Sequence, residues 1–250
     1  MQLDFYFWSY QCPLNGETLR LLQEYRDRLQ ITLHDISGDA QTAREQRMFF
    51  PTLTVVNGTH RFFSPLHRSF LETLCGGTVP EESPYRPPLG TRPLTGTVVP
   101  LTEENFALSG GCTGCNCAQS CSKKLAFLKK QGLSTFGFLN LGSQNKLLGG
   151  AEYLPSSAVP YAVPKDKETA FVTCVYLSRP DYDTKRAPLQ ALEKHLAGRY
   201  HTVEVLSDET GIFPNGDLRF FTQQGYQDAG ILSREPSYCT IHLLTKNIKK

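Results

Sequence analysis

Cysteines gather in the middle of the chain, where glycines also interrupt the sequence. Thiolates this close together can converge on one soft ion such as Zn²⁺, Cu(I) or an iron–sulfur cluster, and flanking glycines let the backbone turn them toward one centre. The spacing differs from that of a zinc finger, which pairs two distant knuckles. The pattern predicts either a thiol-lined pocket for one soft metal ion or a set of reduced cysteines without metal. The cysteines concerned are Cys112, Cys115, Cys117 and Cys121.

Cys12 is a separate thiol that follows an apolar run. That run, residues 3–8, predicts a strand, and leucines at helical spacing predict a helix after Cys12, up to Leu29. The positive end of a helix stabilises a thiolate. Cys12 is therefore expected either to do chemistry as a single thiol or to be an inert part of a binding scaffold.

The residues up to 77 predict one small domain of alternating strands and helices. After the first strand and helix, apolar alternation predicts a strand at 31–36, and a charged stretch predicts a short helix at 40–48. Asn57-Gly58 is typical of a tight hairpin turn between strands at 52–56 and 60–63, and a last helix is expected at 65–74.

A proline-rich segment, residues 78–94, separates this domain from the rest of the chain. Prolines stiffen a chain and remove backbone donors, so the segment is predicted to be a semi-rigid linker. A second domain is expected at 95–250, where an apolar strand at 170–177 is typical of the centre of a sheet. Its other expected strands are 97–101, 136–139, 147–153, 202–206 and 239–244, and its helical regions are 102–131, 185–196 and 215–224.

Composition excludes several classes of protein. The chain has 26 Lys+Arg against 24 Asp+Glu, a net charge of +2, so it lacks the basic excess of a nucleic-acid-binding domain. No apolar run is long enough to span a bilayer, and the first residues lack the basic segment of a signal peptide. We therefore expect a cytoplasmic protein with reduced cysteines and with neither a nucleic-acid nor a membrane partner.

Residues 50–53, Phe-Pro-Thr-Leu, followed by the Asn57-Gly58 turn, resemble the segment of thioredoxin-like proteins in which a cis-proline faces the redox cysteine. Together with the order of elements, this makes residues 1–77 similar to a thioredoxin-like domain. The second cysteine of that family's CxxC motif falls on Asn15, which cannot resolve a mixed disulfide. A dithiol oxidoreductase is therefore not expected.

Several segments of residues 95–250 match the order of elements in one known family: an opening strand and helix at 97–105, strands at 136–139, 149–155 and 170–177, and a helix with its following turn at 215–226. By these segments the domain resembles the GNAT-type N-acetyltransferases, and within them the YoaP-like branch. A thioredoxin-like segment also accompanies the acetyltransferase domain in that branch, but there it follows that domain. The two resemblances imply an α/β protein: an N-terminal thioredoxin-like domain followed by a GNAT-like α+β domain with a mixed, mostly antiparallel sheet.

The GNAT resemblance also implies where acetyl-CoA binds. The family's fourth strand holds the pantetheine arm, which falls here on Cys174, Val175 and Tyr176. Its glycine-rich phosphate loop falls on residues 183–188, where no glycine remains and Pro188 lacks an amide donor. Lys185 and Arg186 are expected to contact the phosphates through their side chains instead.

Proton transfer needs a base for the amine and an acid for the leaving thiolate. The tyrosine that often serves as acid in the family falls on Phe221, which cannot donate a proton. Glu152, Tyr176 and Tyr226 are the catalytic candidates on the acceptor side, with Cys12 as a fourth candidate. Glu152 is either a solvent-facing charge or the base, and Cys174 is either an inert buried thiol or part of the site.

Three functions follow from these observations. The first is an acetyl-CoA-dependent N-acetyltransferase that acts on a small amine by direct attack, without a covalent intermediate. The second is a non-catalytic thiol-rich protein that binds a soft metal ion or a thiol ligand, and the third is a redox protein with one reactive thiol. The altered phosphate loop favours the second over the first, whereas the order of domains favours the first.

Overall fold

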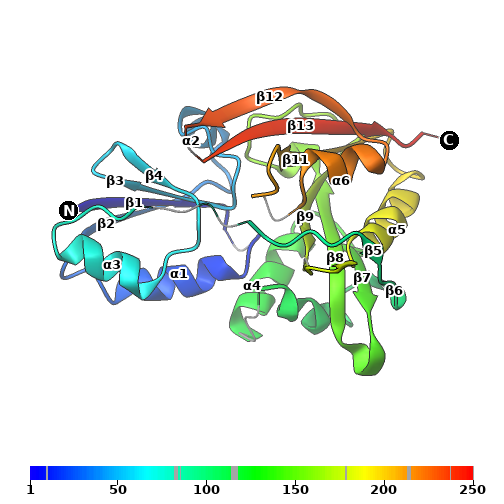
Figure 1. The fold of residues 1–250 in the computed structure, drawn as a ribbon, viewed down its shortest axis with the longest axis horizontal. Helices are drawn as coiled ribbons and strands as arrows, with labels where there is room; N and C mark the ends of the chain where they lie inside the picture. The colour runs from blue at the N-terminus through cyan, green and yellow to red at the C-terminus, as the bar shows by residue number, and fades with distance from the viewer. Residues whose placement is uncertain are drawn as a thin grey trace. The chain divides into compact units, whose positions relative to one another are not determined.

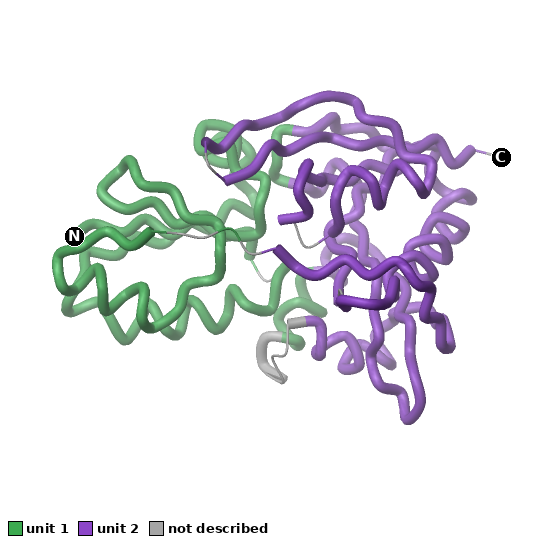
Figure 2. The backbone as a smooth tube through the Cα atoms, viewed as in Figure 1, with its two compact units in different colours: residues 1–84, 119–127, 160–162 green, residues 85–118, 128–159, 163–250 purple. Residues whose placement is uncertain are grey.

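A computed structural model describes residues 1–9, 11–81, 84, 86–113, 118–177, 179–212, 215–236 and 238–249 of the 250-residue chain. The chain divides into two compact units (Figure 2). The first contains residues 1–84, 119–127 and 160–162, and the second contains residues 85–118, 128–159 and 163–250. The change between them after residue 84 falls inside the segment predicted to be a linker.

The first unit is a four-stranded sheet with helices, and its elements follow the predicted order (Figure 1). The strand order is β2-β1-β3-β4, with β1 parallel to β2 and the other pairs antiparallel. The helices α1 and α3 pack on the same face of the sheet, where Leu22 and Leu71 meet Leu3 and Phe5 of β1. The elements are β1 (Gln2–Phe7), α1 (Leu14–Gln23), β2 (Gln30–Asp35), α2 (Ala40–Glu45), β3 (Thr52–Val56), β4 (His60–Phe62) and α3 (Arg68–Cys75).

Two details of this unit differ from expectation. The peptide bond before Pro51 is trans and not cis, which is the form that most X–Pro bonds adopt. The unit also includes two segments from later in the chain, because the buried ring of Trp8 packs against Phe127 and Tyr161 with centroids 6.2 Å and 5.1 Å apart. Phe127 belongs to α4 (Ala118–Lys129), most of which lies in the first unit.

The second unit is built on a seven-stranded sheet of order β12-β13-β11-β9-β8-β7-β6. Only β9 and β11 pair in parallel within it, so the sheet is mixed and mostly antiparallel, as expected. The apolar strand β9 occupies its centre, which confirms the prediction from its sequence. The elements are β5 (Arg92–Pro93), β6 (Thr97–Leu101), η1 (Phe106–Thr113), β7 (Gly137–Leu141), η2 (Ser143–Asn145), β8 (Leu147–Pro155), η3 (Ser156–Ala158), β9 (Thr169–Tyr176), β10 (Tyr182–Asp183), α5 (Arg186–Leu196), β11 (Thr202–Asp208), α6 (Leu218–Gln223), β12 (Gln227–Glu235) and β13 (Cys239–Asn247).

The helical region expected at 102–131 is not one helix. It consists of the 3₁₀ helix η1 and the later α-helix α4, and η1 contains Gly110 and Gly111, which are poor α-helix formers. The helix expected from residue 215 begins at Leu218 because Asp217 caps it, accepting a hydrogen bond from Phe220 N at 2.7 Å.

The two faces of the large sheet have different coverings. On one face, α5 packs its leucines onto Ala151, Tyr153, Val172 and Val175. Side chains alternate along a strand, so Glu152, Cys174 and Tyr176 point to the other face. There η1 packs against β8.

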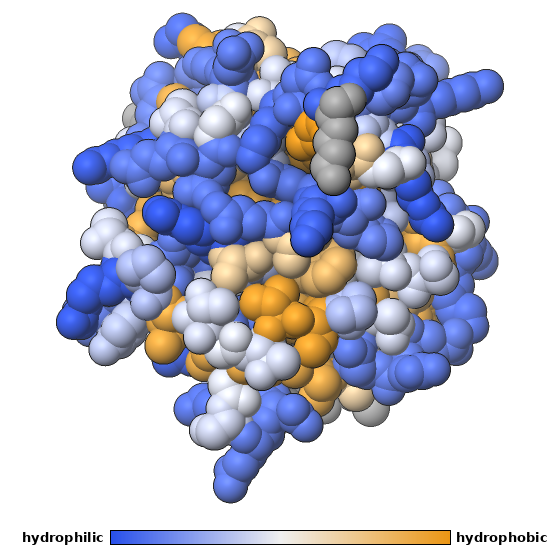
Figure 3. Space-filling view, turned by 90° about the vertical axis from the view of Figure 1, so that its right-hand side faces the viewer, coloured by the Kyte–Doolittle hydropathy of each residue, from blue (hydrophilic) through white to orange (hydrophobic). Residues whose placement is uncertain are grey.

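The surface is mainly polar. Figure 3 shows one face on which hydrophilic residues predominate, with hydrophobic residues gathered near its centre. Among the described residues, Tyr182 and Ile231 are the large hydrophobic side chains that are clearly exposed. Within that part of the chain no helix has the length and apolar character needed to cross a membrane.

Candidate functional site

The central strands β9 and β11 are paired for only part of their length. Residues 169–172 pair with residues 202–205, and beyond them no further pairing connects the two strands. The buried side chain of Asn215 bridges the strands at this point. Its Oδ1 accepts from Val175 N at 2.8 Å, and its Nδ2 donates to Leu206 O at 3.1 Å. A carboxamide thus satisfies a backbone donor on β9 and a backbone acceptor on β11.

A carboxyl group, a thiol and a phenol share the face of the sheet beside this point. Glu152 of β8 lies opposite Cys174 of β9, and Tyr176 lies opposite Gly150. Gly150 is required for this packing, because a Cβ there would lie 2.5 Å from Tyr176 Oη. Glu152 and Tyr176 are both buried. Because the local dielectric constant is low inside a protein, the electrostatic interaction between the carboxyl group and the phenol is stronger there than in water.

Electrostatics connects a second thiol to this group. Burial raises the pKa of Tyr176 well above its usual value, and the charges of Glu152, Cys112 and Cys174 raise it further. Cys112 comes from η1, which packs on this face. We call Cys112, Glu152, Cys174 and Tyr176 the polar cluster. Its phenol stays protonated at neutral pH and is therefore a proton donor.

Lys185, just before α5, is the cation beside Cys174. Burial lowers the pKa of Lys185 to about 8, while the charges of Cys174, Asp183 and Asp217 act in the opposite direction. Only 4% of its surface is exposed. The charge of Cys174 acts on this buried ammonium, so Lys185 lies close enough to interact electrostatically with the polar cluster.

The N-terminus of α5 is occupied by a side chain of the same loop. Lys185 N and Arg186 N each donate to Asp183 Oδ1 at 3.0 Å, and Arg186 Nε lies 3.0 Å from Asp183 Oδ2. Amides at such a position are the usual binding site of a phosphate. Because a buried carboxylate holds them here, these residues do not fit the diphosphate of acetyl-CoA in the way that the family resemblance implies. The expected phosphate contacts of Lys185 and Arg186 stay a prediction.

Tyr226 lies on the other face of the sheet from Glu152. It packs in the core under α5 and α6, where its ring meets Phe221 at 5.2 Å. Burial raises its pKa well above the usual value, followed by the charge of Glu193. The structure therefore brings Glu152 and Tyr176 together and leaves Tyr226 in a different environment.

Cys12 lies where the sequence predicts, immediately before α1 in the first unit. Its carbonyl oxygen accepts from Asn15 N at 3.0 Å, and Asn15 Nδ2 donates to Ser9 O at 2.6 Å. Asn15 is fully buried, so the position at which a second cysteine would be needed holds a structural amide.

The cysteine-rich segment is described only in part. Cys115 and Cys117 lie outside the described residues, while Cys112 is in η1 and Cys121 in α4. Within the ranges that the structure describes, no three or more His, Cys, Asp or Glu residues are placed to hold a metal ion. The soft-metal site stays a prediction.

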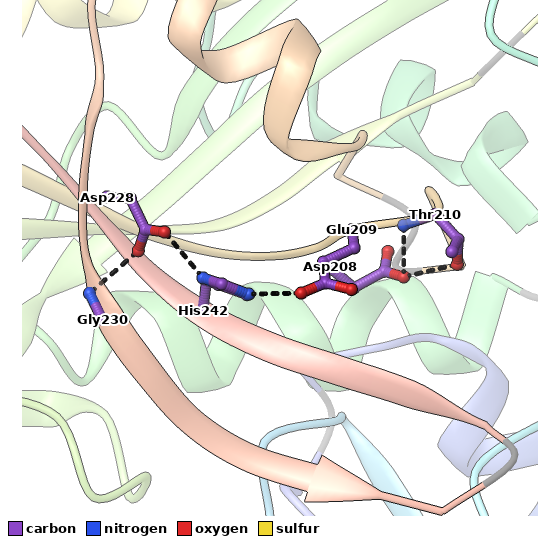
Figure 4. Close-up of polar contacts among 6 residues, drawn as sticks. All are labelled: Asp208, Glu209, Thr210, Asp228, Gly230 and His242. Atoms are coloured by element: carbon purple, nitrogen blue, oxygen red, sulfur yellow. Dashed lines mark hydrogen bonds and ion pairs between the residues drawn. The ribbon is translucent and has the colours of Figure 1, made fainter.

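A further polar group, absent from the sequence-based predictions, lies where β11 ends (Figure 4). His242 Nδ1 lies 2.8 Å from Asp228 Oδ2, and its Nε2 lies 3.4 Å from Glu209 Oε1. Asp208 accepts from both the amide and the hydroxyl of Thr210. Glu209 and Thr210 also line a cavity of about 390 Å³. Sequence gave no signal for this group because its members are far apart in the chain.

No model of a protein family matches the chain, and no curated protein matches it. Solved structures of acetyltransferases are similar to it. Aminoglycoside 6′-acetyltransferase type Ii has 12% identity and a TM-score of 0.44, covering 62% of this chain and 99% of its own. An N-acetyltransferase from Staphylococcus aureus Mu50 has 13% identity and a TM-score of 0.46, covering 61% and 98%. Aminoglycoside 6′-N-acetyltransferase complexed with coenzyme A has 12% identity and a TM-score of 0.44, covering 62% and 98%. With so low an identity and TM-score, the likeness says nothing of what this chain binds or catalyses.

Proposed function

We propose that the second unit is a GNAT-like acyltransferase that moves an acyl group from a thioester to a small amine at the polar cluster. The observation that carries this proposal is the parting of β9 and β11 next to Glu152 and Tyr176. The backbone groups beside the parting bond the carboxamide of Asn215, and an extended amide-bearing ligand would take the place of that carboxamide.

The residues of the cluster have the chemistry that this reaction needs. Glu152 takes the proton of the attacking amine, and Tyr176 returns a proton to the leaving thiolate. The high pKa of Tyr176 keeps the phenol protonated for that role. The amine attacks the thioester carbonyl directly, the C–S bond breaks, and no bond to the protein forms. Because Glu152 and Tyr176 are buried, η1 has to move off this face for the substrates to enter.

We also propose that the first unit is thioredoxin-like. A thioredoxin-like segment accompanies the acetyltransferase domain in the YoaP-like branch too, although there it follows that domain. The element order β1-α1-β2-α2-β3-β4-α3 and the strand order β2-β1-β3-β4 support this proposal. The single thiol of Cys12 and the buried Asn15 make it a binding domain or a one-thiol redox domain.

A thiol-rich binding protein is the second candidate. The charges of two cysteines, Cys112 and Cys174, both raise the pKa of Tyr176, and both cysteines are partly exposed. Thiolates bind soft metal ions, so anaerobic metal analysis of the untagged, reduced protein tests this candidate. Stoichiometric metal that is lost when Cys112 becomes Ser would support it.

The test of the acyltransferase is a transfer assay with the reduced full chain, acetyl thioesters and a panel of small amines, read by free thiol and by product mass. Loss of a general base or acid lowers kcat by roughly 10²–10⁴-fold. We expect such losses in Glu152→Gln and Tyr176→Phe, and none in the control Glu104→Gln, which removes an exposed carboxylate. Absence of transfer with every thioester and amine, or full activity in both cluster variants, would overturn the proposal.

A further inference from the structure

The N-terminal end of α5 determines whether the proposed enzyme can bind a thioester that carries a diphosphate. Two backbone amides there, those of Lys185 and Arg186, donate to the same oxygen of Asp183. Asp183 is 8% exposed. A diphosphate placed at this end would have to displace that carboxylate and leave a buried negative charge next to its own charges, which is strongly unfavourable.

The neighbouring positive charges already face carboxylates. The guanidinium of Arg186 forms an ion pair with Asp183 at 3.0 Å. Lys185 is buried and lies under the influence of Asp183 and Asp217 as well as Cys174. Pro188, in the first turn of α5, has no amide to offer. A second anion at this end would therefore find its donors in use.

The loop before α5 is also held along its edge. Residues 90–94 run beside it, with β5 parallel to β10. Gly90 N donates to Arg179 O at 2.8 Å, and Leu94 N donates to Asp183 O at 2.9 Å. The contact is close, because a Cβ on Gly90 would lie 2.1 Å from Tyr182 N. Opening this loop for a diphosphate would break a paired strand as well as the contacts of Asp183.

The place where β9 and β11 separate differs chemically from the N-terminal end of α5, because the side chain bound there is uncharged. Its bridging group is the carboxamide of Asn215, which bonds both strands. The amides of a pantetheine arm offer the same donors and acceptors, and the arm itself carries no charge. A pantetheine arm at the parting would displace the uncharged carboxamide of Asn215, whereas a diphosphate at α5 would displace the charged carboxylate of Asp183, so the chain fits the thiol half of an acyl-CoA better than its nucleotide half.

We infer that the acyl donor of this protein is a pantetheine thioester without a diphosphate, and that Asp183 excludes the nucleotide of acyl-CoA. This inference rests on the acyltransferase proposed above. The donor is either a free acyl-pantetheine or the acylated phosphopantetheine arm of a carrier protein, since both present the same thioester and amides.

The experiment compares kcat/KM for acetyl-CoA, S-acetylpantetheine and an acetylated carrier protein with the same amine. For the natural chain we expect acetyl-CoA to be no better than S-acetylpantetheine, and the carrier arm then distinguishes the free source from the protein-bound one. A built diphosphate site would favour acetyl-CoA by about tenfold or more, because it adds charged hydrogen bonds. That preference would overturn the inference while leaving the acyltransferase intact. Absence of transfer from all three donors would remove the acyltransferase and the inference with it.

Asp183→Asn tests the cause. The amide keeps an oxygen for the two backbone donors and removes the charge, and Asp181→Asn, an exposed neighbour, is the matched control. We expect the ratio of acetyl-CoA to S-acetylpantetheine to rise severalfold in Asp183→Asn only. Calorimetry with adenosine 5′-diphosphate, which carries the diphosphate, provides a readout apart from activity: no binding to the natural chain, and measurable binding to Asp183→Asn. A ratio that is equal in both variants would overturn the role of Asp183.

Discussion

Lys185 should destabilise the second unit at neutral pH. Burial lowers its pKa from 10.5 to about 8. Because the pKa in the folded state is lower than in the unfolded state, the unfolded chain binds more protons between these values, and stability rises as the pH increases through them. Below pH 8 the penalty is complete. At about 1.4 kcal/mol for each pH unit it amounts to about 3 kcal/mol.

Replacing Lys185 with Met removes this penalty. The gain in unfolding free energy should be about 3 kcal/mol at pH 7 and about 1 kcal/mol at pH 9.5. Effects of packing do not depend on pH, so they cancel when the two gains are compared. The expected difference between them is about 2 kcal/mol.

Urea unfolding of the full chain, followed by labelling of the buried thiol of Cys239, reports on the second unit. Lys194→Met is the control, because Lys194 is exposed on the same helix and should give the same result at both pH values. The comparison is repeated in a Cys174→Ala background, since a thiol also ionises in this range. A gain for Lys185→Met that is equal at pH 7 and pH 9.5 would refute the reasoning.

Three other predictions concern the thiols, the polar group at the end of β11 and the linker. Cys12 precedes α1 whereas Cys75 ends α3, so the helix dipole should make iodoacetamide react faster with Cys12 at pH 7; equal rates would leave Cys12 a scaffold residue. His242→Ala should lower the unfolding free energy by about 1–3 kcal/mol through loss of its bond to Asp228, and a double-mutant cycle with Asp228→Ala should show coupling. Limited proteolysis should cut first between residues 78 and 89, before the strand-paired residues 90–94, and an earlier cut elsewhere would contradict the linker.

Local patterns were sufficient to predict most of the elements. Apolar alternation and turn residues identified most strands of both units, but not β5, β10 or β12. The uninterrupted apolar run of β9 predicted its central position. The same patterns put Glu152 and Tyr176 on neighbouring strands. That Glu152 and Tyr176 lie on the same face of the sheet could be learned only from the pairing register of β8 and β9. A shift of that register by one residue would place one of the two side chains on the opposite face.

Long-range polar contacts could not be predicted in this way. Asn215 bonds Val175 from 40 residues away, and nothing in the local sequence distinguishes it from a helix-capping asparagine. The proline-rich segment predicted as a linker ends in a paired strand, because its backbone is already extended and the amides of Gly90, Arg92 and Leu94 can still donate. Such pairing depends on which loop lies beside it, and that is a property of the fold.

The charges of the polar cluster affect the two candidate functions, acyl transfer and thiol-based metal binding, in different ways. A thiol-rich metal site needs Cys112 and Cys174 as thiolates, which would add two negative charges beside the buried carboxyl of Glu152. Lys185 supplies one compensating charge and already faces Asp183 and Asp217. Buried like charges repel strongly, so the cluster accepts two thiolates only if a metal ion enters with them. Acyl transfer needs no added charge, because it uses only the carboxyl group of Glu152 and the protonated phenol of Tyr176. The described residues therefore favour the acyltransferase, with metal binding as a competing state of the same face.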